Sequence, residues 1–290
     1  MRVHLDCFPC FLRQSIIALR LGTRDAALQG KILKAILGEV ERSDTSRPPA
    51  YATTFIHRTI RQLLQKDPFH AIKSEYNQIA LSLYPFLKKL VKESADPLWT
   101  ASRLAVAGNV IDFGIFTSVD IEGTVKRALH SPFAVDEYQA FKDALSDTEE
   151  VLYLLDNAGE IVFDKILIET MKSRGKKVIA VVKGSPVLND CTMADAAEAG
   201  LPAICSVIDN GSDAVGTIIE WASGDFQKRY AQAQFIVSKG QGNFETVSDT
   251  TKTIAYLFQS KCEVVSRELG LSLGSMILKM SWPISRNPKS

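Results

Sequence analysis

The second half of the chain alternates short apolar runs with segments of helical periodicity, and this alternation restricts the fold more than any other feature. Val151–Leu155 (VLYLL) and Lys177–Val182 (KVIAVV) are the clearest runs, and each precedes a loop and then helix-patterned sequence. Strands alternating with helices predict a parallel sheet covered by helices on both faces, hence an α/β fold. Further strands are predicted at Ala203–Ile208, Gln234–Ser238 and Thr253–Leu257, with Ser275–Lys279 as a candidate last strand.

The first part of the chain has a helical pattern instead. Apolar residues recur at helical spacing from about residue 8 to residue 108, in FLRQSIIALRL, DAALQGKILKAILGEVE and FIHRTIRQLLQ. A long stretch around Glu75–Lys92 continues the pattern, and we expect Pro85 to interrupt it. The dipeptides Asp67-Pro68 and Asp96-Pro97 predict helix boundaries. We therefore expect a helical N-terminal region, 1–108, and an α/β/α domain, 109–290.

Charge and hydropathy exclude several kinds of partner. Lys and Arg number 34 against 33 Asp and Glu, so there is no electrostatic reason to expect nucleic acid or an anionic membrane. No apolar run approaches the roughly 20 residues of a membrane-spanning helix. The N-terminus MRVHLDCFPC lacks the basic-then-apolar pattern of a signal peptide. We expect a cytoplasmic protein, in which five cysteines are thiols or metal ligands before they are disulfides.

Oxygen-rich side chains follow two of the predicted strands. Asp156-Asn157 comes directly after VLYLL, and Asp190 lies in the loop after KVIAVV. In a parallel sheet, ligands bind at the carboxyl ends of strands, and carboxylate and amide oxygens suit Mg²⁺ or Mn²⁺. The alternative is local structure: a turn with a helix cap at Asp156-Asn157, and an N-cap at Asp190 for a helix over Thr192–Ala199.

A lysine and a glycine-rich loop follow another strand. In Lys239-Gly240-Gln241-Gly242-Asn243, backbone N–H groups could approach an anion closely, although a turn is the default interpretation. Asp209-Asn210-Gly211-Ser212-Asp213 indicates a turn first and substrate hydrogen bonding second. Metal donors, a lysine and an anion loop at separate strand ends favour a phosphorylated small molecule bound with a divalent metal. Phosphoryl hydrolysis is then the natural reaction.

Other chemistries lack their motifs. There is no GxxxxGK[ST], GxSxG or HExxH, and none of the four histidines lies on these loops. Ala158 stands where an aspartyl-phosphate phosphatase would carry its second aspartate. The loop DNAGE has a single glycine, which argues against a dinucleotide-binding turn.

The N-terminal pair Cys7 and Cys10 forms a CxxC. It could contribute to a second metal site with a distant partner such as Cys262, form a redox pair, or consist of structural thiols. No second CxxC completes a four-cysteine zinc site. A structural role is favoured over a metal.

Several motifs together resemble the domain of unknown function 89 family, also called damage-control phosphatases or acidic-residue-methyltransferase-like proteins. The resemblance covers nearly the whole chain, and the CxxC is similar to that of the small bacterial and archaeal branch. The motifs are CFPCFLRQ, DPF with Lys73 and Asn77, AGNVIDFG, LDNAGE followed by Asp164, NDCT, GSDAVGT, SKGQGNFET and KCEVVSRELG.

The resemblance implies a helical N-terminal region and a Rossmann-like α/β/α metal-binding catalytic domain with a mostly parallel sheet. It implies a divalent metal, whether Mg, Mn, Co or Ni, held by Asp156, Asn157 and Asp190, which with Lys239 form the expected catalytic set. It also implies a substrate- and phosphate-binding set: Asn109, Asp112, Glu160, Lys239, Gly240, Gln241, Gly242 and Asn243. Cys191, and Asp209-Asn210 before GSD, depart from the family pattern.

The leading functional prediction is a metal-dependent phosphatase, a phosphomonoester hydrolase acting on small phosphometabolites such as sugar phosphates or damaged cofactor intermediates. The first alternative is an S-adenosylmethionine-dependent carboxyl methyltransferase, and the second is a non-catalytic phosphometabolite-binding protein. The hard-oxygen donors favour the first, because methyl transfer needs no such cluster.

Overall fold

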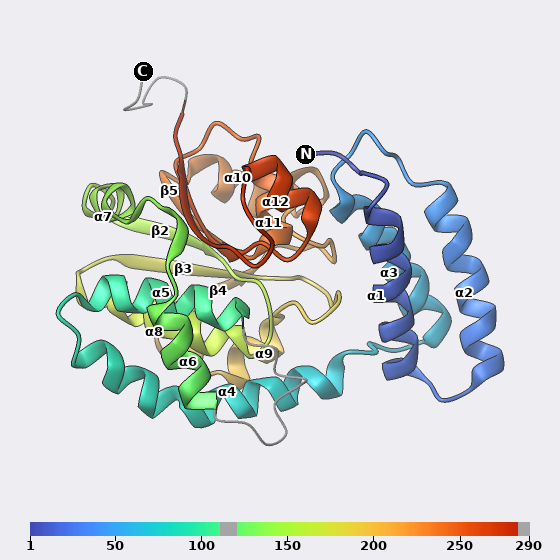
Figure 1. The fold of residues 1–290 in the computed structure, drawn as a ribbon, viewed down its shortest axis with the longest axis horizontal. Coiled ribbons are helices and arrows are strands. Elements are labelled where there is room, and N and C mark those ends of the chain that lie inside the picture. The colour runs from blue at the N-terminus through green and yellow to red at the C-terminus, as the bar shows by residue number, and fades with distance from the viewer. Residues whose placement is uncertain (111–120, 284–290) are drawn as a thin grey trace.

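A seven-stranded sheet runs through the computed structural model, which describes residues 1–110 and 121–283 (Figure 1). Its strand order is β1-β7-β6-β5-β2-β3-β4, and the neighbouring strands are parallel except for β6 and β7. The predicted α/β class with a mostly parallel sheet is confirmed. The strands are β1 (Phe133–Asp136), β2 (Glu150–Leu154), β3 (Lys177–Val182), β4 (Ser206–Asp209), β5 (Phe235–Lys239), β6 (Ile254–Gln259) and β7 (Met276–Ser281).

Helices account for most of the remaining described chain. Those of the N-terminal half are α1 (Cys7–Gly22), α2 (Ala26–Glu41), α3 (Pro49–Leu64), α4 (His70–Lys92), α5 (Pro97–Val110) and α6 (Ile121–His130). Those that follow are α7 (Tyr138–Ser146), α8 (Glu160–Ser173), α9 (Met193–Glu198), α10 (Gly224–Gln232), α11 (Gln241–Val247) and α12 (Glu263–Leu269), with short 3-10 turns at Leu201–Ala203 and Ile219–Trp221. No helix of the described chain is both long enough and apolar enough to cross a membrane.

The two faces of the sheet carry separate cores. Alternate residues of a strand point to opposite faces, so Val151 and Tyr153 pack on one side while Leu152 and Leu154 pack on the other. The first core includes α4, α5 and α8, and the second includes α10, α11 and α12. The inner strands β2, β3 and β6 are buried on both faces and are therefore almost continuously apolar, which is why they stood out in the sequence.

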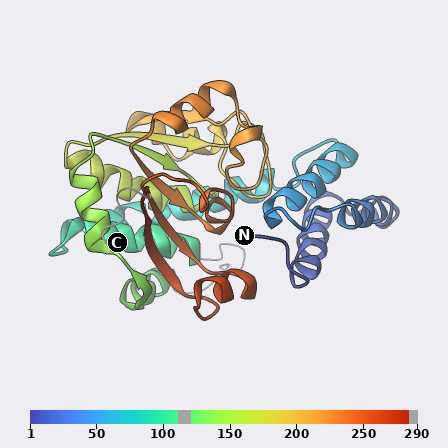
Figure 2. The ribbon, with the colours of Figure 1, turned by 90° about the horizontal axis from the view of Figure 1, so that it is seen from above.

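The helices before residue 108 fall into two packing groups. Helices α1, α2 and α3 pack around a third core, with Phe11, Ile32 and Ile60 buried in it, and Val264 of α12 also joins this core. These three helices stand to one side of the sheet (Figure 2). Helices α4 and α5 instead contribute Leu87 and Leu104 to the core of the sheet. The packing thus divides this helical part between α3 and α4, and the domain division at 108/109 stays a prediction.

Most predicted elements are confirmed, and two details differ. The bounds of β3 match, and the other predicted strands shift by one to three residues. The short strand β1 was not predicted, and α4 continues through Pro85 where an interruption was expected. A proline inside a helix costs about 3 kcal/mol. Burial of Leu83 and Leu87 on either side offsets this cost, since each buried leucine contributes about 1.5–3 kcal/mol.

Candidate active site

The loops after β2, β3 and β5 meet because these three strands are neighbours and parallel. Asn157 and Asp190 form an isolated backbone bridge, and the N–H of Cys191 donates to the carbonyl of Asp156 over 2.8 Å. The structure thus brings Asp156, Asn157 and Asp190 together, as the sequence predicted. It also rejects the capping alternatives: α8 follows Gly159, and the N-cap of α9 is Thr192, in a capping box with Asp195.

The Asp156 carboxylate is crowded by acidic neighbours. Its Oδ2 accepts hydrogen bonds from Nδ2 of Asn157 at 2.7 Å and Nδ2 of Asn109 at 3.2 Å. Burial, with the negative charges of Glu160 and Asp190, holds the pKa of Asp156 well above its ordinary value. These clustered carboxylate oxygens favour the binding of a cation.

Gly240 allows the loop after β5 to approach Asp156. A Cβ atom at Gly240 would lie 2.0 Å from Oδ2 of Asp156, and the residue has φ +79°. Both facts require glycine here, because a side chain would collide with the carboxylate and an L-residue disfavours this φ. One predicted phosphate-loop glycine therefore makes room for the proposed metal ligand.

Beneath Asp156 lies a buried charge cluster. Nζ of Lys239 is 2.5 Å from Oε1 of Glu160, 2.8 Å from Oδ1 of Asp164 and 2.9 Å from the carbonyl oxygen of Ala105. Burial alone would lower the pKa of Lys239, but the pairs with Asp164 and Glu160 hold it above its ordinary value. These three contacts use all three N–H donors of the ammonium group. In this arrangement Lys239 holds the Glu160 carboxylate in place through their ion pair.

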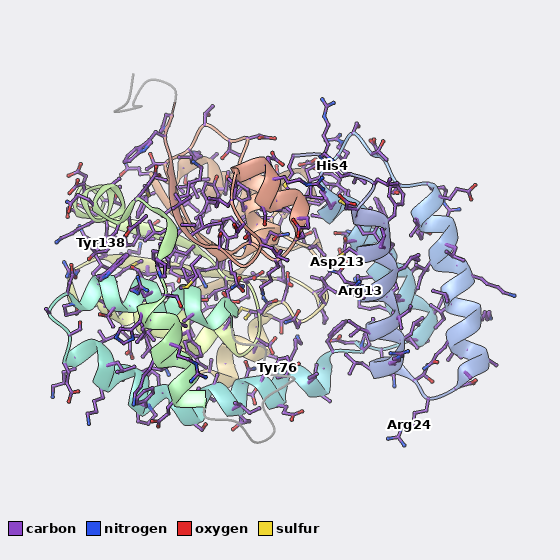
Figure 3. The ribbon with its side chains drawn as sticks, in the orientation of Figure 1. His4, Arg13, Arg24, Tyr76, Tyr138 and Asp213 are labelled. Carbon is purple, nitrogen blue, oxygen red and sulfur yellow. The ribbon has the colours of Figure 1, made fainter. Side chains whose placement is uncertain are left out.

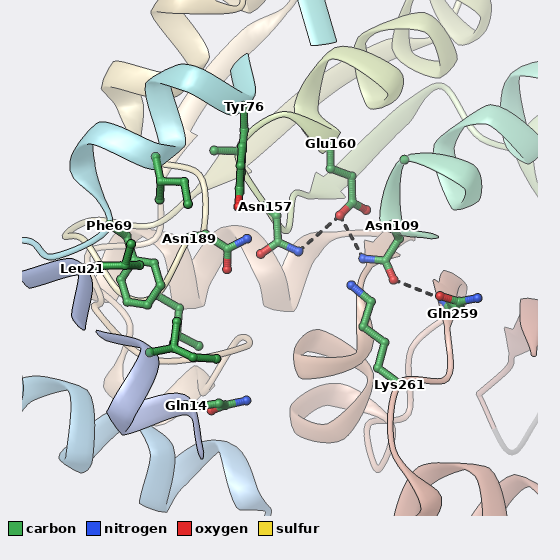
Figure 4. A pocket seen from close by; sticks show the side chains of 15 residues that line it. Gln14, Leu21, Phe69, Tyr76, Asn109, Asn157, Glu160, Asn189, Gln259 and Lys261 are labelled. Carbon is green, nitrogen blue, oxygen red and sulfur yellow. Dashed lines mark hydrogen bonds between the residues drawn. The ribbon is translucent and has the colours of Figure 1, made fainter. Parts of the chain in front are cut away.

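The charges and hydrogen bonds around Glu160 favour its ionised form despite its burial. Burial would raise its pKa, but Lys239, Lys261 and a hydrogen bond from Asn109 hold it below the ordinary value. The Asn109 amide donates to Oε2 of Glu160 over 2.8 Å, and its Oδ1 accepts from the backbone N–H of Gln259 (Figure 4). Asn109 and Glu160 therefore lie in the site, as the resemblance implied. Asp112 lies outside the described residues.

The remaining loop residues tie the strand ends together. Nδ2 of Asn243 donates to the carbonyls of Leu155 and Lys239, and its Oδ1 accepts from Oγ1 of Thr217. Gln241 binds Glu245 with its Nε2 and the backbone N–H of Lys261 with its Oε1. These side chains order the loop, and a phosphate beside residues 240–243 stays a prediction.

Two lysines next to Asp190 had no assigned role at the sequence level. Nζ of Lys183 is 3.3 Å from Oδ2 of Asp190 and also donates to the carbonyl of Gly216. Lys73, from α4, is 3.0 Å from Oδ2 of Asp195 and 3.5 Å from the carbonyl of Asp190. Burial raises the pKa of Asp190 in spite of Lys183. Lys183 was visible as a strand-end residue and Lys73 as part of a family motif, but only the packing of α4 shows that Lys73 lies beside Asp190.

A cavity of about 480 Å³ opens beside these residues (Figure 4). Asn109, Asn157, Glu160 and Lys261 line it together with apolar side chains from α1 and α4. The exposed Lys261 comes from the loop after β6. Its charge opposes the rise in the pKa of Asp156 and, after Lys239, helps to hold the pKa of Glu160 below its ordinary value. Among the described residues no carboxylate lies within 4.0 Å of its ammonium group, so Lys261 is a cation available at the cavity.

Three thiols lie at a second cavity of about 340 Å³, which Cys7, Cys10 and Cys262 line together with Asp156, Asn157 and Asp190. Cys7 is buried and Cys10 is exposed, all are free thiols, and burial raises the pKa values of Cys7 and Cys10. Within residues 1–110 and 121–283, no three His, Cys, Asp or Glu side chains are grouped to hold a metal. The structural role favoured for Cys7 and Cys10 stays a prediction, with a second metal as its alternative. The proposed site at Asp156 is not a group of this kind, because one of its three donors, Asn157, is an amide.

Comparisons with known proteins match the sequence and the fold of this chain to one family. The family model for the damage-control phosphatase ARMT1-like domain matches residues 3–277. A damage-control phosphatase of Archaeoglobus fulgidus is 32% identical over 288 residues, 97% of this chain and 99% of that protein. One of Pyrococcus horikoshii is 30% identical over 282 residues, 96% of this chain and 97% of that protein. The crystal structure of a DUF89 family protein from P. horikoshii matches with a TM-score of 0.91 at 30% identity, covering 97% of this chain and 99% of that one.

Proposed function

The chain belongs to the damage-control phosphatase ARMT1-like family, which confirms the resemblance of its motifs, and we propose that it is a metal-dependent phosphomonoester hydrolase acting on small phosphorylated metabolites. The observation that carries this proposal is the convergence of Asp156, Asn157 and Asp190, which all line the 340 Å³ cavity, while Asn157 also lines the 480 Å³ cavity. Two of the chain's relatives are named damage-control phosphatases, and a cavity flanked by oxygen donors and a lysine suits a phosphate ester. A cytoplasmic location stays a prediction.

The residues present fit a divalent cation. Asp156 and Asp190 are carboxylates whose pKa values are raised by burial, and Asp156 is further raised by its acidic neighbours, so a cation would relieve the repulsion. Asn157 adds an amide oxygen, and such oxygen-rich sites suit Mg²⁺, Mn²⁺, Co²⁺ or Ni²⁺. A bound cation supplies Lewis-acid stabilisation of negative charge on the phosphoryl group.

The chain's own residues would position the ester. The Lys261 ammonium lies at the cavity and can bind a phosphate oxygen, and its positive charge offsets the negative charges of Asp156 and Glu160. Lys239 and Asn109 fix the Glu160 carboxylate, which can accept a hydrogen bond from an attacking water. Lys239 therefore acts on the substrate through Glu160 in this proposal, instead of through the direct phosphate contact expected from the sequence.

The test is phosphate release by the purified protein from a panel of phosphate monoesters, with each of the four metals and with EDTA. We expect release that requires a divalent metal and stops when the metal is chelated. Transfer of label from S-adenosylmethionine to protein carboxyl groups, without phosphate release, would support the methyltransferase alternative. Binding of phosphate esters without turnover under every metal would support the non-catalytic one.

A further inference from the structure

The cavity at the active site has two unlike walls. Asn109, Glu160, Gln259 and Lys261 form a polar wall on one side (Figure 4). Opposite them, α1 and the start of α4 form a mostly apolar wall, to which Gln14 and Tyr76 add polar groups. Leu21 and Phe69 face the gap, and Asn157 and Asn189 lie between the walls. A molecule that fills this cavity therefore meets charge and hydrogen bonds at one end and hydrocarbon at the other.

The apolar wall includes a face of α1 that does not pack into the core. Phe11, Ala18 and Leu19 are buried in the core of α1, α2 and α3. Gln14, Ile17 and Leu21 follow the spacing of one helical face and line the cavity instead. Ile17 is 47% exposed and Leu21 is 41% exposed, so the helix presents two large aliphatic side chains to the cavity.

A strained residue adds to the same wall. Leu188, in the loop after β3, has φ +47°, a conformation that is rare for a bulky residue. Its side chain lines the cavity one residue before Asn189 and two before Asp190. Strain of this kind is stored where the surrounding structure needs a side chain in a given place, commonly at ligand-binding sites.

We propose that the natural substrate is an amphipathic phosphate monoester, whose phosphate lies at the polar wall and whose apolar or aromatic group packs on Ile17, Leu21, Phe69 and Leu188. This inference rests on the proposed function and narrows its substrate class. A sugar phosphate would place hydroxyl groups against aliphatic side chains, where they lose hydrogen bonds to water without replacement. An apolar group instead removes exposed hydrocarbon from water on both sides of the contact.

The test compares two esters of primary alcohols, n-hexyl phosphate and glucose 6-phosphate, under the same metal. We expect kcat/KM to be about tenfold or more higher for the hexyl ester. Leu21→Gln and Ile17→Gln should remove most of this preference, because each lowers kcat/KM for the hexyl ester more than kcat/KM for glucose 6-phosphate. Ile16→Gln is the matched control, because Ile16 is an exposed aliphatic residue of α1 that does not line the cavity. Equal or better turnover of glucose 6-phosphate would overturn the inference.

Leu188→Asn separates binding from folding. Asparagine tolerates positive φ better than leucine, so this variant should be at least as stable as the wild type while it loses preference for the hexyl ester. Calorimetry of hexylphosphonate and glycerol phosphate binding compares the two dissociation constants, and so tests the apolar wall without any turnover. Preferred binding of hexylphosphonate by a protein that hydrolyses no ester would support the apolar wall and refute the phosphatase proposal. Hydrolysis of esters without such a binding preference would support the phosphatase proposal and refute the apolar wall as a substrate site.

Discussion

Nζ of Lys239 lies 2.5 Å from Oε1 of Glu160, and the two side chains are 0% and 2% exposed. Asp164 completes the cluster from the next turn of α8, and its Oδ1 also accepts a hydrogen bond from the hydroxyl of Tyr153. One ammonium group thus compensates two buried carboxyl groups. The end of β5 is thereby fixed to the start of α8, directly beneath the proposed metal ligands.

Lys239→Met should destabilise the protein, because it leaves buried carboxyl groups without their cation. Breaking a buried pair in this way costs about 3–5 kcal/mol in the free energy of unfolding, which urea unfolding would measure. Adding Asp164→Asn should restore part of the loss. A Lys239→Met protein of wild-type stability that only binds phosphate less tightly would instead indicate direct phosphate contact.

Lys261→Gln, at an exposed lysine, should leave stability unchanged but raise KM and lower kcat.

Gly240→Ala should cost more than backbone strain alone. At φ +79° any alanine is strained by about 1–2 kcal/mol, and here its Cβ would also meet Asp156 at 2.0 Å. Gly175→Ala is the matched control, since Gly175 has the same φ and no atom within 4 Å of the added Cβ. Thermal unfolding with and without metal would show the collision as a lost metal response in Gly240→Ala alone. An equal effect of both substitutions would contradict the close approach.

His57 should make the protein sensitive to acid. The residue is 1% exposed in α3, and burial, followed by the charge of Arg61, lowers its pKa to about 3. Its ordinary pKa is about 6.5, so between these values the unfolded chain binds a proton that the folded chain does not. The stabilisation is complete above pH 6.5 and is lost as the pH falls toward 3.

From pH 7.5 to pH 5.0 this linkage removes about 2 kcal/mol from the free energy of unfolding. In urea unfolding at the two pH values, His57→Gln should lose less stability than the wild type by that amount. His70→Gln, which removes an exposed imidazole from α4, is the control. Identical pH dependence in His57→Gln and the wild type would show that His57 is protonated in the folded protein.

The sequence was most informative where local pattern and fold class agree. β3 was predicted with its bounds because five of the six residues in Lys177–Val182 are apolar, as burial on both faces requires. The four-residue strand β1 at the sheet edge alternates in exposure and gave no such signal. Asp156, Asn157 and Asp190 could be grouped in advance because parallel neighbours place their carboxyl ends together.

Other parts of the site depend on tertiary packing that no local pattern encodes. Lys261 reaches the cavity from the loop after β6, and Ile17 and Leu21 reach it from a helix that packs around the third core. The resemblance placed Lys239 at the phosphate, but only coordinates show that Glu160, Asp164 and the Ala105 carbonyl use its donors. Sequence thus located the strand ends, and packing decided what each side chain contacts.

The double variant Cys7→Ser with Cys10→Ser should keep most phosphatase activity in freshly purified protein. Phosphoryl transfer needs no thiol, and two soft thiolates would select a different metal from the oxygen site. Because Cys7 is buried, replacing it by a hydroxyl group should lower the free energy of unfolding by about 1 kcal/mol. A folded double variant that binds metal at the aspartates and is still inactive would place the thiols in the reaction.

Phosphate release by the wild type and by Asp156→Asn, each with and without divalent metal, tests the central claim most directly. The substitution removes a charge that its neighbours disfavour, so the variant should fold with at least wild-type stability in the absence of metal. We expect metal-dependent release by the wild type and at least about a 100-fold loss in the variant. Asp225→Asn, at a fully exposed aspartate of α10, should match the wild type. Full metal-dependent release by Asp156→Asn would contradict the assignment of the metal site.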